Sequence, residues 1–168
     1  MGEDALQITT KRLENGIVSG FMHDKLKVGD LVQLAPPFGY FNVVEGDSPI
    51  VCLSAGIGMT PMKAFADAHG GRVHKIVHVD RSMEEVPFRA HFDQNYKDKT
   101  EYVISASEQS ETIAKVTEAI KNAPADTKYY VCGPTGFMCA VAMSLRKSGV
   151  ESGNIVWEAF SPTLSCPV

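Results

Sequence analysis

From residue 48 onward, short apolar runs alternate along the chain with segments whose apolar residues recur at helical spacing. Strands that alternate with helices in this way form a parallel sheet with helices on both faces. The expected strands lie in the runs Ile50–Leu53, Val73–Val79, Tyr102–Ser105, Tyr129–Cys132 and Ile155–Ala159. The expected helices lie near residues 60–69, 88–96, 111–122 and 136–147. The pattern therefore predicts a doubly wound α/β domain with a five-stranded parallel sheet in the order 3-2-1-4-5.

The first 46 residues follow another pattern. Leu6–Arg12 and Leu31–Leu34 alternate partly between apolar and polar positions, which is typical of half-buried antiparallel strands. Ser19–Leu26 is predicted to form a short helix between them. A closed barrel needs enough strands to remove its edges, and this segment is too short to supply them. The chain is thus expected to consist of residues 1–46, the C-terminal part of an incomplete antiparallel barrel, and residues 47–168, the α/β domain.

Composition narrows the classes of partner. Hydrophobic residues make up 44% and charged residues 21% of the 168 residues, as in a soluble globular protein. The net charge of −4 and the pI near 5.7 argue against nucleic acid or an anionic membrane as a partner, because both require a concentrated positive surface. The first residues lack the features of a signal peptide, and no apolar stretch reaches the ~18 residues of a membrane span. The default expectation is a cytoplasmic protein.

Neither the cysteines nor the histidines have the spacing of a metal site. The four cysteines form no CxxC pair and lie in or beside apolar stretches, so each is expected to be a reduced thiol. The five histidines show no HxH or HExxH spacing and are interpreted as surface residues or hydrogen-bonded internal ones. The residues concerned are Cys52, Cys132, Cys139 and Cys166, and His23, His69, His74, His78 and His91. The sequence therefore predicts no bound metal.

The segment Ser54–Pro61 connects the first expected strand with the first helix, at the position where open α/β sheets bind their ligands. Gly56 and Gly58 allow a tight turn and the close approach of a phosphate, and the free N–H groups of the following helical turn attract anions. Thr60 is the expected N-cap of the helix, and Pro61 suits its first turn. The motif departs from GxGxxG, so from these residues alone a purely structural turn is an open alternative.

A second glycine turn, Val131–Met138, follows the fourth expected strand. It repeats the same order, in which an apolar run leads to a turn at Gly133 and Pro134 and then to a helix. In a sheet ordered 3-2-1-4-5 the first and fourth strands are neighbours, and their connections leave in opposite directions. Both glycine turns are therefore expected to flank one crevice, which is where such a sheet binds a dinucleotide.

Both turns and the C-terminal segment resemble the ferredoxin–NADP reductase superfamily, in particular the reductase portion of the flavohaemoglobins, which are nitric oxide dioxygenases. The motifs that carry the resemblance in the α/β part are Leu53–Pro61, Cys132–Pro134, Gly136–Met138 and Trp157–Pro162. Residues 16–19, 23–24, 27–30 and 35–39 are similar to the second half of that family's flavin-binding barrel. The resemblance covers nearly the whole chain and implies an FAD-binding barrel segment followed by an NAD(P)H-binding domain.

The resemblance also implies a role for each motif. Cys132, Gly133 and Pro134 would line the nicotinamide pocket. Glu158 would lie near the flavin ring and influence its redox behaviour, while Phe160 would stack on that ring, so Cys132, Glu158 and Phe160 are the candidate catalytic residues. The pyrophosphate of NAD(P)H would contact Ala55, Gly56, Ile57, Gly58, Met59, Thr60 and Pro61. The other implied cofactor contacts are Ser19, Arg81, Ala159, Ser161 and Pro162.

Residue patterns without the resemblance leave plainer interpretations open at the candidate catalytic positions. Cys132 at a strand end is then a small buried residue, and Phe160 is an ordinary core aromatic. Glu158 is then a solvated carboxylate that alternates with Trp157 across the strand.

The residues after the second expected strand bear on the choice between NADH and NADPH. Asp80 lies where the adenosine ribose is expected, and an acidic residue there favours the free 2′-hydroxyl of NADH. Arg81 and Ser82 would instead accept a 2′-phosphate. We expect NADH, with NADPH as the open alternative.

Two parts of the family's machinery are absent from this sequence, namely the Arg-x-Tyr-Ser motif that holds the flavin and the haem-binding globin. We therefore expect a truncated chain with an incomplete FAD site, and haem only in an upstream domain. The implied function is hydride transfer from NAD(P)H to FAD, followed by electron transfer to the haem of a globin domain. The alternatives are a dinucleotide-binding fragment without activity of its own and a reductase for an iron–sulfur acceptor.

Overall fold

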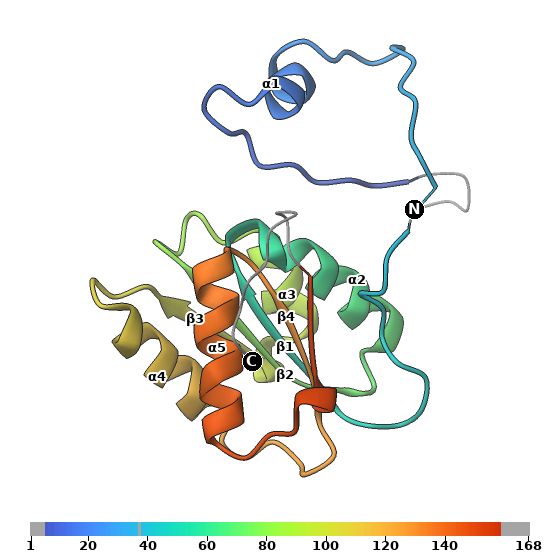
Figure 1. Cartoon of the computed structure of the whole chain (residues 1–168). Helices are drawn as coiled ribbons and strands as arrows, with labels where there is room; N and C mark the ends of the chain where they lie inside the picture. The colour runs from blue at the N-terminus through green and yellow to red at the C-terminus, as the bar shows by residue number, and fades with distance from the viewer. Residues whose placement is uncertain (1–5, 37, 159–168) are drawn as a thin grey trace. The chain divides into compact units, whose positions relative to one another are not determined.

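The computed structural model describes residues 6–36 and 38–158 of the chain. The chain forms two units, residues 1–40 and 41–168, and each is described by itself (Figure 1). The segment expected to be part of a barrel provides the first unit, and the predicted α/β domain lies in the second.

The division between the units falls after Tyr40, earlier than the boundary expected after residue 46. The residues that follow pack on the α/β unit: the Phe41 ring centroid lies 5.2 Å from that of Phe65 and 5.9 Å from that of Tyr130. The Val44 backbone N–H also donates to the Tyr130 hydroxyl at 2.9 Å. This short apolar stretch therefore belongs to the core of the second unit.

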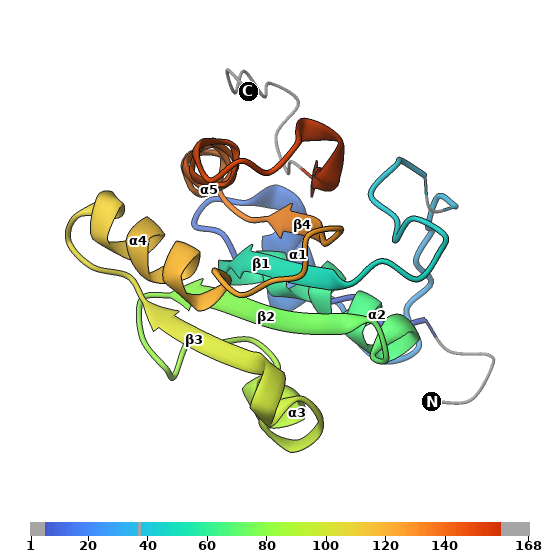
Figure 2. The ribbon, with the colours of Figure 1, turned by 90° about the horizontal axis from the view of Figure 1, so that it is seen from below.

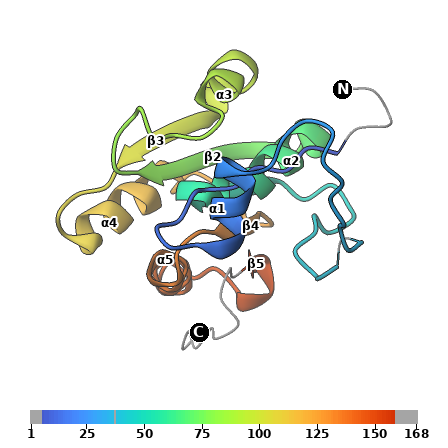
Figure 3. The ribbon, with the colours of Figure 1, turned by 90° about the horizontal axis from the view of Figure 1, so that it is seen from above.

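The second unit is built on a parallel sheet of five strands in the order β3-β2-β1-β4-β5. The strands are β1 (Ile50–Ala55), β2 (Val73–Asp80), β3 (Thr100–Ile104), β4 (Lys128–Cys132) and β5 (Ile155–Glu158). Figure 2 shows β3 at one edge of the sheet, and Figure 3 shows β5 at the other. The central strand β1 is buried along its whole length, as its continuous apolar run predicts. The predicted α/β class and strand order are confirmed.

Helices cover both faces of the sheet. They are α2 (Met59–His69), α3 (Arg89–Asn95), α4 (Gln109–Ala119) and α5 (Thr135–Lys147). Because side chains alternate along a strand, neighbouring residues of β1 enter different apolar clusters. Cys52 packs in one cluster with Met62 of α2. Leu53 packs in the other with Val116 of α4 and Val141 of α5. In the described part of the chain, no helix is long and apolar enough to cross a bilayer.

The first unit contains the helix α1 (Ile17–Asp24). The strands predicted at Leu6–Arg12 and Leu31–Leu34 are wrong, since both segments are irregular in the structure. A strand needs a hydrogen-bonded partner and an apolar layer against its inner face. Neither is present here: Leu6 is 88% and Leu31 is 101% exposed, and no described residue of this unit is buried. The alternating pattern is real, but the described unit offers it no core to join.

Three of the four cysteines lie in the described part of the chain. Cys52 and Cys132 are free and buried, in agreement with the prediction. Cys139 is disulfide-bonded, so the prediction of a reduced thiol is wrong at this position. Sequence spacing detects only cysteine pairs that are close in the chain, so it gave no sign of this disulfide.

Candidate dinucleotide site

The two glycine turns lie against each other at the carboxyl edge of the sheet. β1 ends at Ala55 and continues as a 3-10 turn, Gly56–Gly58, before α2 begins at Met59. A β-carbon built on Gly58 would lie 2.2 Å from the carbonyl oxygen of Cys132, which is far inside van der Waals contact. Residue 58 must therefore be glycine, because the backbone of the second turn occupies the place of its side chain.

Gly133 makes the reciprocal contact from the second turn. A β-carbon there would lie 3.1 Å from both the backbone nitrogen and the β-carbon of Ala55. β1 and β4 are paired with Ser54 opposite Cys132, so both turns leave the sheet at the same level. The structure thus brings together the two turns that the sequence placed around one crevice.

A helix begins directly at each turn. The N-cap of α2 is Gly58 and not the predicted Thr60, whose hydroxyl donates to the Ile57 carbonyl at 3.1 Å. The N-cap of α5 is Pro134. The first-turn residues Met59, Thr60 and Pro61 belong to α2 itself. Since a helix N-terminus carries partial positive charge and unpaired N–H groups, two such ends at one edge favour an anionic ligand.

A row of polar side chains crosses all five strands next to these turns. The strands pair so that the row contains Tyr102, His78, Ser54, Cys132 and Glu158, in sheet order. The row two residues earlier on the same face contains Thr100, Ile76, Cys52, Tyr130 and Val156. The later row contains the ionisable His78 and Glu158, whereas the earlier row contains no histidine and no carboxylate. The groups able to carry chemistry therefore gather at the edge where the turns meet.

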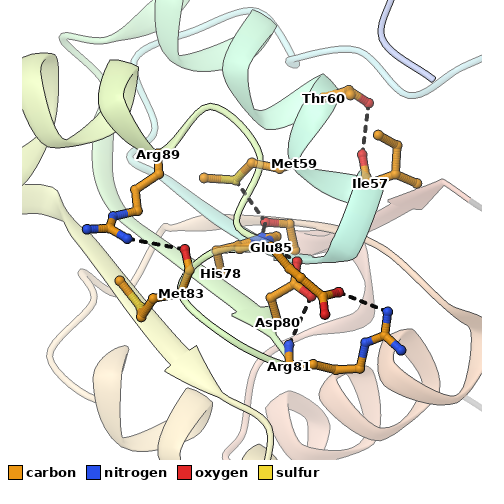
Figure 4. A network of polar contacts seen from close by, with 10 residues as sticks. Ile57, Met59, Thr60, His78, Asp80, Arg81, Met83, Glu85 and Arg89 are labelled. Atoms are coloured by element: carbon orange, nitrogen blue, oxygen red, sulfur yellow. Dashed lines mark hydrogen bonds and ion pairs between the residues drawn. The ribbon is translucent and has the colours of Figure 1, made fainter. Parts of the chain in front are cut away.

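Ser54 and His78 of this row form a buried hydrogen-bonded chain with Asp80, which lies two residues after His78 on β2. Ser54 Oγ and His78 Nδ1 are 2.8 Å apart, and His78 Nε2 lies 3.4 Å from Asp80 Oδ2 (Figure 4). Ser54 and His78 are fully buried, and Asp80 is 7% exposed. Burial lowers the pKa of His78, and the hydrogen bond and charge of Asp80 oppose that shift. The ring is consequently neutral at pH 7.

Sequence reasoning did not assign His78 a place at the site, since its spacing fits no metal motif. The structure shows it to be an internal, hydrogen-bonded histidine, which was one of the two interpretations given. A signal was nevertheless present, because His78 and Asp80 are polar residues two positions apart in an otherwise apolar strand end. Residues at that spacing point to the same face of a sheet.

Cys132 is fully buried, and its register partner on β5 is Glu158. Burial, with a smaller contribution from the Glu158 charge, raises the pKa of the Cys132 thiol to about 12. The thiol is therefore protonated at neutral pH and is unsuited to act as a nucleophile. Glu158 is partly exposed, so it retains contact with solvent at the same edge.

Arg81 follows the end of β2 and is turned toward solvent. Its side chain is 71% exposed and forms an ion pair with Glu85 at 2.8 Å (Figure 4). Its backbone N–H donates to Asp80 Oδ1 at 2.9 Å. Both oxygens of the Asp80 carboxylate thus have protein partners, one at the Arg81 amide and the other at His78.

The remaining predicted cofactor contacts lie in the first unit or outside the described residues. Ser19 lies in α1 of the first unit, where its Oγ accepts the N–H of Leu13 at 3.2 Å. The candidate residues Ala159, Phe160, Ser161 and Pro162 lie outside the described residues. The roles of these residues at the flavin side of the expected site therefore stay predictions.

The chain is similar in sequence to curated flavohemoproteins. Flavohemoprotein A of Dictyostelium discoideum is 34% identical over 95% of the chain, and the flavohemoprotein of Pseudomonas putida is 32% identical over 93%. The chain covers 42% and 43% of these relatives, so it spans less than half of their length. No protein-family model matches the chain.

The fold is also similar to that of solved reductase structures. The flavohem-like FAD/NAD-binding domain of nitric oxide dioxygenase from Vibrio cholerae is 30% identical, with a TM-score of 0.71 over 88% of this chain and 65% of that one. Phthalate dioxygenase reductase, 21% identical, shares the fold with a TM-score of 0.75 over 92% of this chain and 49% of that one.

The five-stranded parallel sheet in the order 3-2-1-4-5 gives the second unit a ferredoxin reductase-like fold. The chain is a homologue of the FAD/NAD-binding part of flavohemoproteins, and the resemblance stated from the sequence is confirmed.

Proposed function

We propose that this chain is the nicotinamide-binding part of an NAD(P)H-dependent flavin oxidoreductase that delivers electrons from FAD to the haem of a globin domain. The observation that carries the proposal is the contact between the two turns at Gly58 and Cys132. It produces an edge of bare backbone beside two helix N-termini. A pyrophosphate and a planar ring can approach such an edge closely.

The chain's own residues act by binding and positioning. The first turns of α2 and α5 supply N–H groups and partial positive charge for the pyrophosphate of the dinucleotide. Cys132 contributes a small protonated thiol beside the nicotinamide position, and Glu158 contributes a carboxylate at the same edge. When bound, the flavin supplies the redox chemistry by accepting hydride and releasing electrons singly.

We propose NADH as the preferred donor. The Arg81 guanidinium is already paired with Glu85 through Nη2, and the charge of that carboxylate opposes the approach of a 2′-phosphate. A ribose with a free 2′-hydroxyl does not meet this repulsion. The support for this preference is therefore the ion pair itself.

One observation favours a second candidate function, a dinucleotide-binding module that turns over nothing by itself. No described residue of the first unit is buried, so this unit has no core of its own to hold a flavin. We propose that residues 1–46 complete an FAD site only together with further barrel strands. Residues 47–168 bind the dinucleotide even when those barrel strands are absent.

The test is an NADH oxidation assay with ferricyanide as acceptor, with and without added FAD. The main proposal predicts tight binding of NADH in both cases and turnover only with FAD. Binding without turnover in either case supports the second candidate, and absence of binding contradicts both. Replacing ferricyanide with a globin haem or a [2Fe–2S] protein separates the proposed acceptor from the iron–sulfur alternative.

A further inference from the structure

The buried hydrogen-bonded residues Ser54, His78 and Asp80 have two possible arrangements of their protons. The second arrangement uses Met59 Sδ as a hydrogen-bond acceptor. Ser54 Oγ lies 2.8 Å from His78 Nδ1 and 3.3 Å from Met59 Sδ. The hydroxyl of Ser54 is therefore within hydrogen-bond distance of two different acceptors. No other described polar group is recorded as a partner of Ser54 Oγ.

The carboxylate of Asp80 fixes the tautomer of the neutral ring. Because a carboxylate only accepts, Nε2 must carry the proton that faces Asp80 Oδ2. Nδ1 is then an acceptor, and Ser54 donates to it. In this state Met59 Sδ receives no hydrogen bond from Ser54.

Addition of one proton to His78 reverses the direction of its hydrogen bond with Ser54. An imidazolium donates from both nitrogens, so Nδ1 donates to Ser54 Oγ while Nε2 continues to donate to Asp80. The Ser54 hydroxyl then turns its own proton to Met59 Sδ. Rotation of one hydroxyl satisfies both charge states, so burial does not leave the charged ring without partners.

The hydrogen-bonded residues Ser54, His78 and Asp80 lie directly beneath the first glycine turn. Ser54 comes just before the turn Ala55–Gly58, and Met59 comes just after it as the first residue of α2. Asp80 holds the backbone N–H of Arg81 at the end of the neighbouring strand. A change of charge at His78 therefore occurs under the proposed pyrophosphate position, at residues that anchor both ends of the turn.

We propose that His78 is a positioning residue that couples proton uptake to dinucleotide binding: the bound pyrophosphate dianion favours the imidazolium, which in turn stabilises the bound state. This inference rests on the proposed function, since it assigns the pyrophosphate to the first turn. By linkage, the ligand binds more tightly as the pH falls through the titration range of His78.

Few other charged or titratable groups lie near His78 to account for a pH dependence of binding. Asp80 is the charged neighbour from the same strand, and burial outweighs its effect so that the pKa of the free His78 is lowered. From β3 the register partner is Tyr102, whose hydroxyl donates to Asp93 of α3 and whose pKa is raised by burial. β1 and α2 contribute the non-titrating Ser54 and Met59, and the row continues with Cys132 of β4 and Glu158 of β5.

The test uses ADP-ribose, whose pyrophosphate does not titrate near neutrality. We expect its Kd to be about 3- to 10-fold lower near pH 5.5 than near pH 8, because a shift of one pKa unit corresponds to a tenfold change. Calorimetry in buffers of different ionisation enthalpy should show proton uptake on binding. The variant His78→Gln, which keeps a donor and an acceptor but cannot be protonated, should lose both effects.

A matched control is His74→Gln, which alters an exposed histidine on the same strand and should keep the pH dependence. An NMR titration of the unmodified chain provides a second measurement that does not depend on the folding of a variant. We expect ADP-ribose to raise the pKa of His78. An unchanged His78 pKa with ADP-ribose bound, or a pH dependence that persists in His78→Gln, overturns the inference alone. Failure of ADP-ribose to bind at any pH overturns the proposed function and the inference with it.

Discussion

Substitution of Gly58 by alanine should damage the candidate site through backbone displacement. The added β-carbon would lie 2.2 Å from the oxygen and 2.5 Å from the carbon of the Cys132 carbonyl, and 2.9 Å from the nitrogen of Gly133. These are backbone atoms, so no side-chain rotation relieves the overlap. Ordinary contact begins at 3.4 Å, and one turn must therefore move away from the other by about 1 Å.

Two measurable effects follow from that displacement. Overpacking of this kind costs about 1–3 kcal/mol, which corresponds to a lower Tm by roughly 2–4 °C for each kcal/mol in a chain of this length. Loss of one hydrogen bond to a charged phosphate costs about 1.5–3 kcal/mol, so the Kd for ADP-ribose should rise roughly tenfold or more. Thermal unfolding and calorimetry measure the two effects separately.

Gly153→Ala is the matched control for this experiment. A β-carbon on Gly153 meets nothing within 4 Å, and its φ does not require glycine. The control should therefore leave both Tm and Kd near their original values. If Gly58→Ala binds ADP-ribose as tightly as Gly153→Ala does, the contact between the turns does not shape the site and the reasoning fails.

Three further predictions concern the surroundings of the site. Glu85→Gln removes the partner of the exposed Arg81 guanidinium, so the ratio of NADPH to NADH affinity should rise several-fold, and an unchanged ratio in binding assays would show that Arg81 does not approach the 2′ position. Cys132 should resist iodoacetamide at pH 7–9 in the folded chain, because the reactive thiolate forms only near its raised pKa of about 12, and rapid labelling followed by mass spectrometry would contradict this. Tyr130→Phe leaves the Val44 N–H without its acceptor and should lower the free energy of unfolding in urea by about 1–2 kcal/mol, whereas no change would mean that this segment is not anchored there.

The sheet was predictable because its sequence carries a local pattern. The apolar runs of β1 and β4 predict buried parallel strands, and the glycine turns that follow them predict where connections leave the sheet. The contact between Gly58 and the Cys132 carbonyl follows from the strand order, which the alternation of strands and helices already indicates. The location of the candidate site therefore did not depend on tertiary detail.

Other features depend on contacts that a sequence does not display. The strands expected around Leu6 and Leu31 require partners, and local alternation cannot show whether partners are present. The N-cap moved from Thr60 to Gly58 because the 3-10 turn continues directly into the helix. His78 became visible as part of the site only when strand register placed it beside Ser54.

The central claim is that the two glycine turns together form the dinucleotide site, and amide NMR with ADP-ribose tests it most directly. We predict that the amide signals of residues 55–60 and 133, 135 and 136 shift together, with the same dependence on ligand concentration. The contradicting result is that these signals stay in place while shifts gather around the cavity of about 590 Å³ lined by Ile120, Pro124 and Asn154.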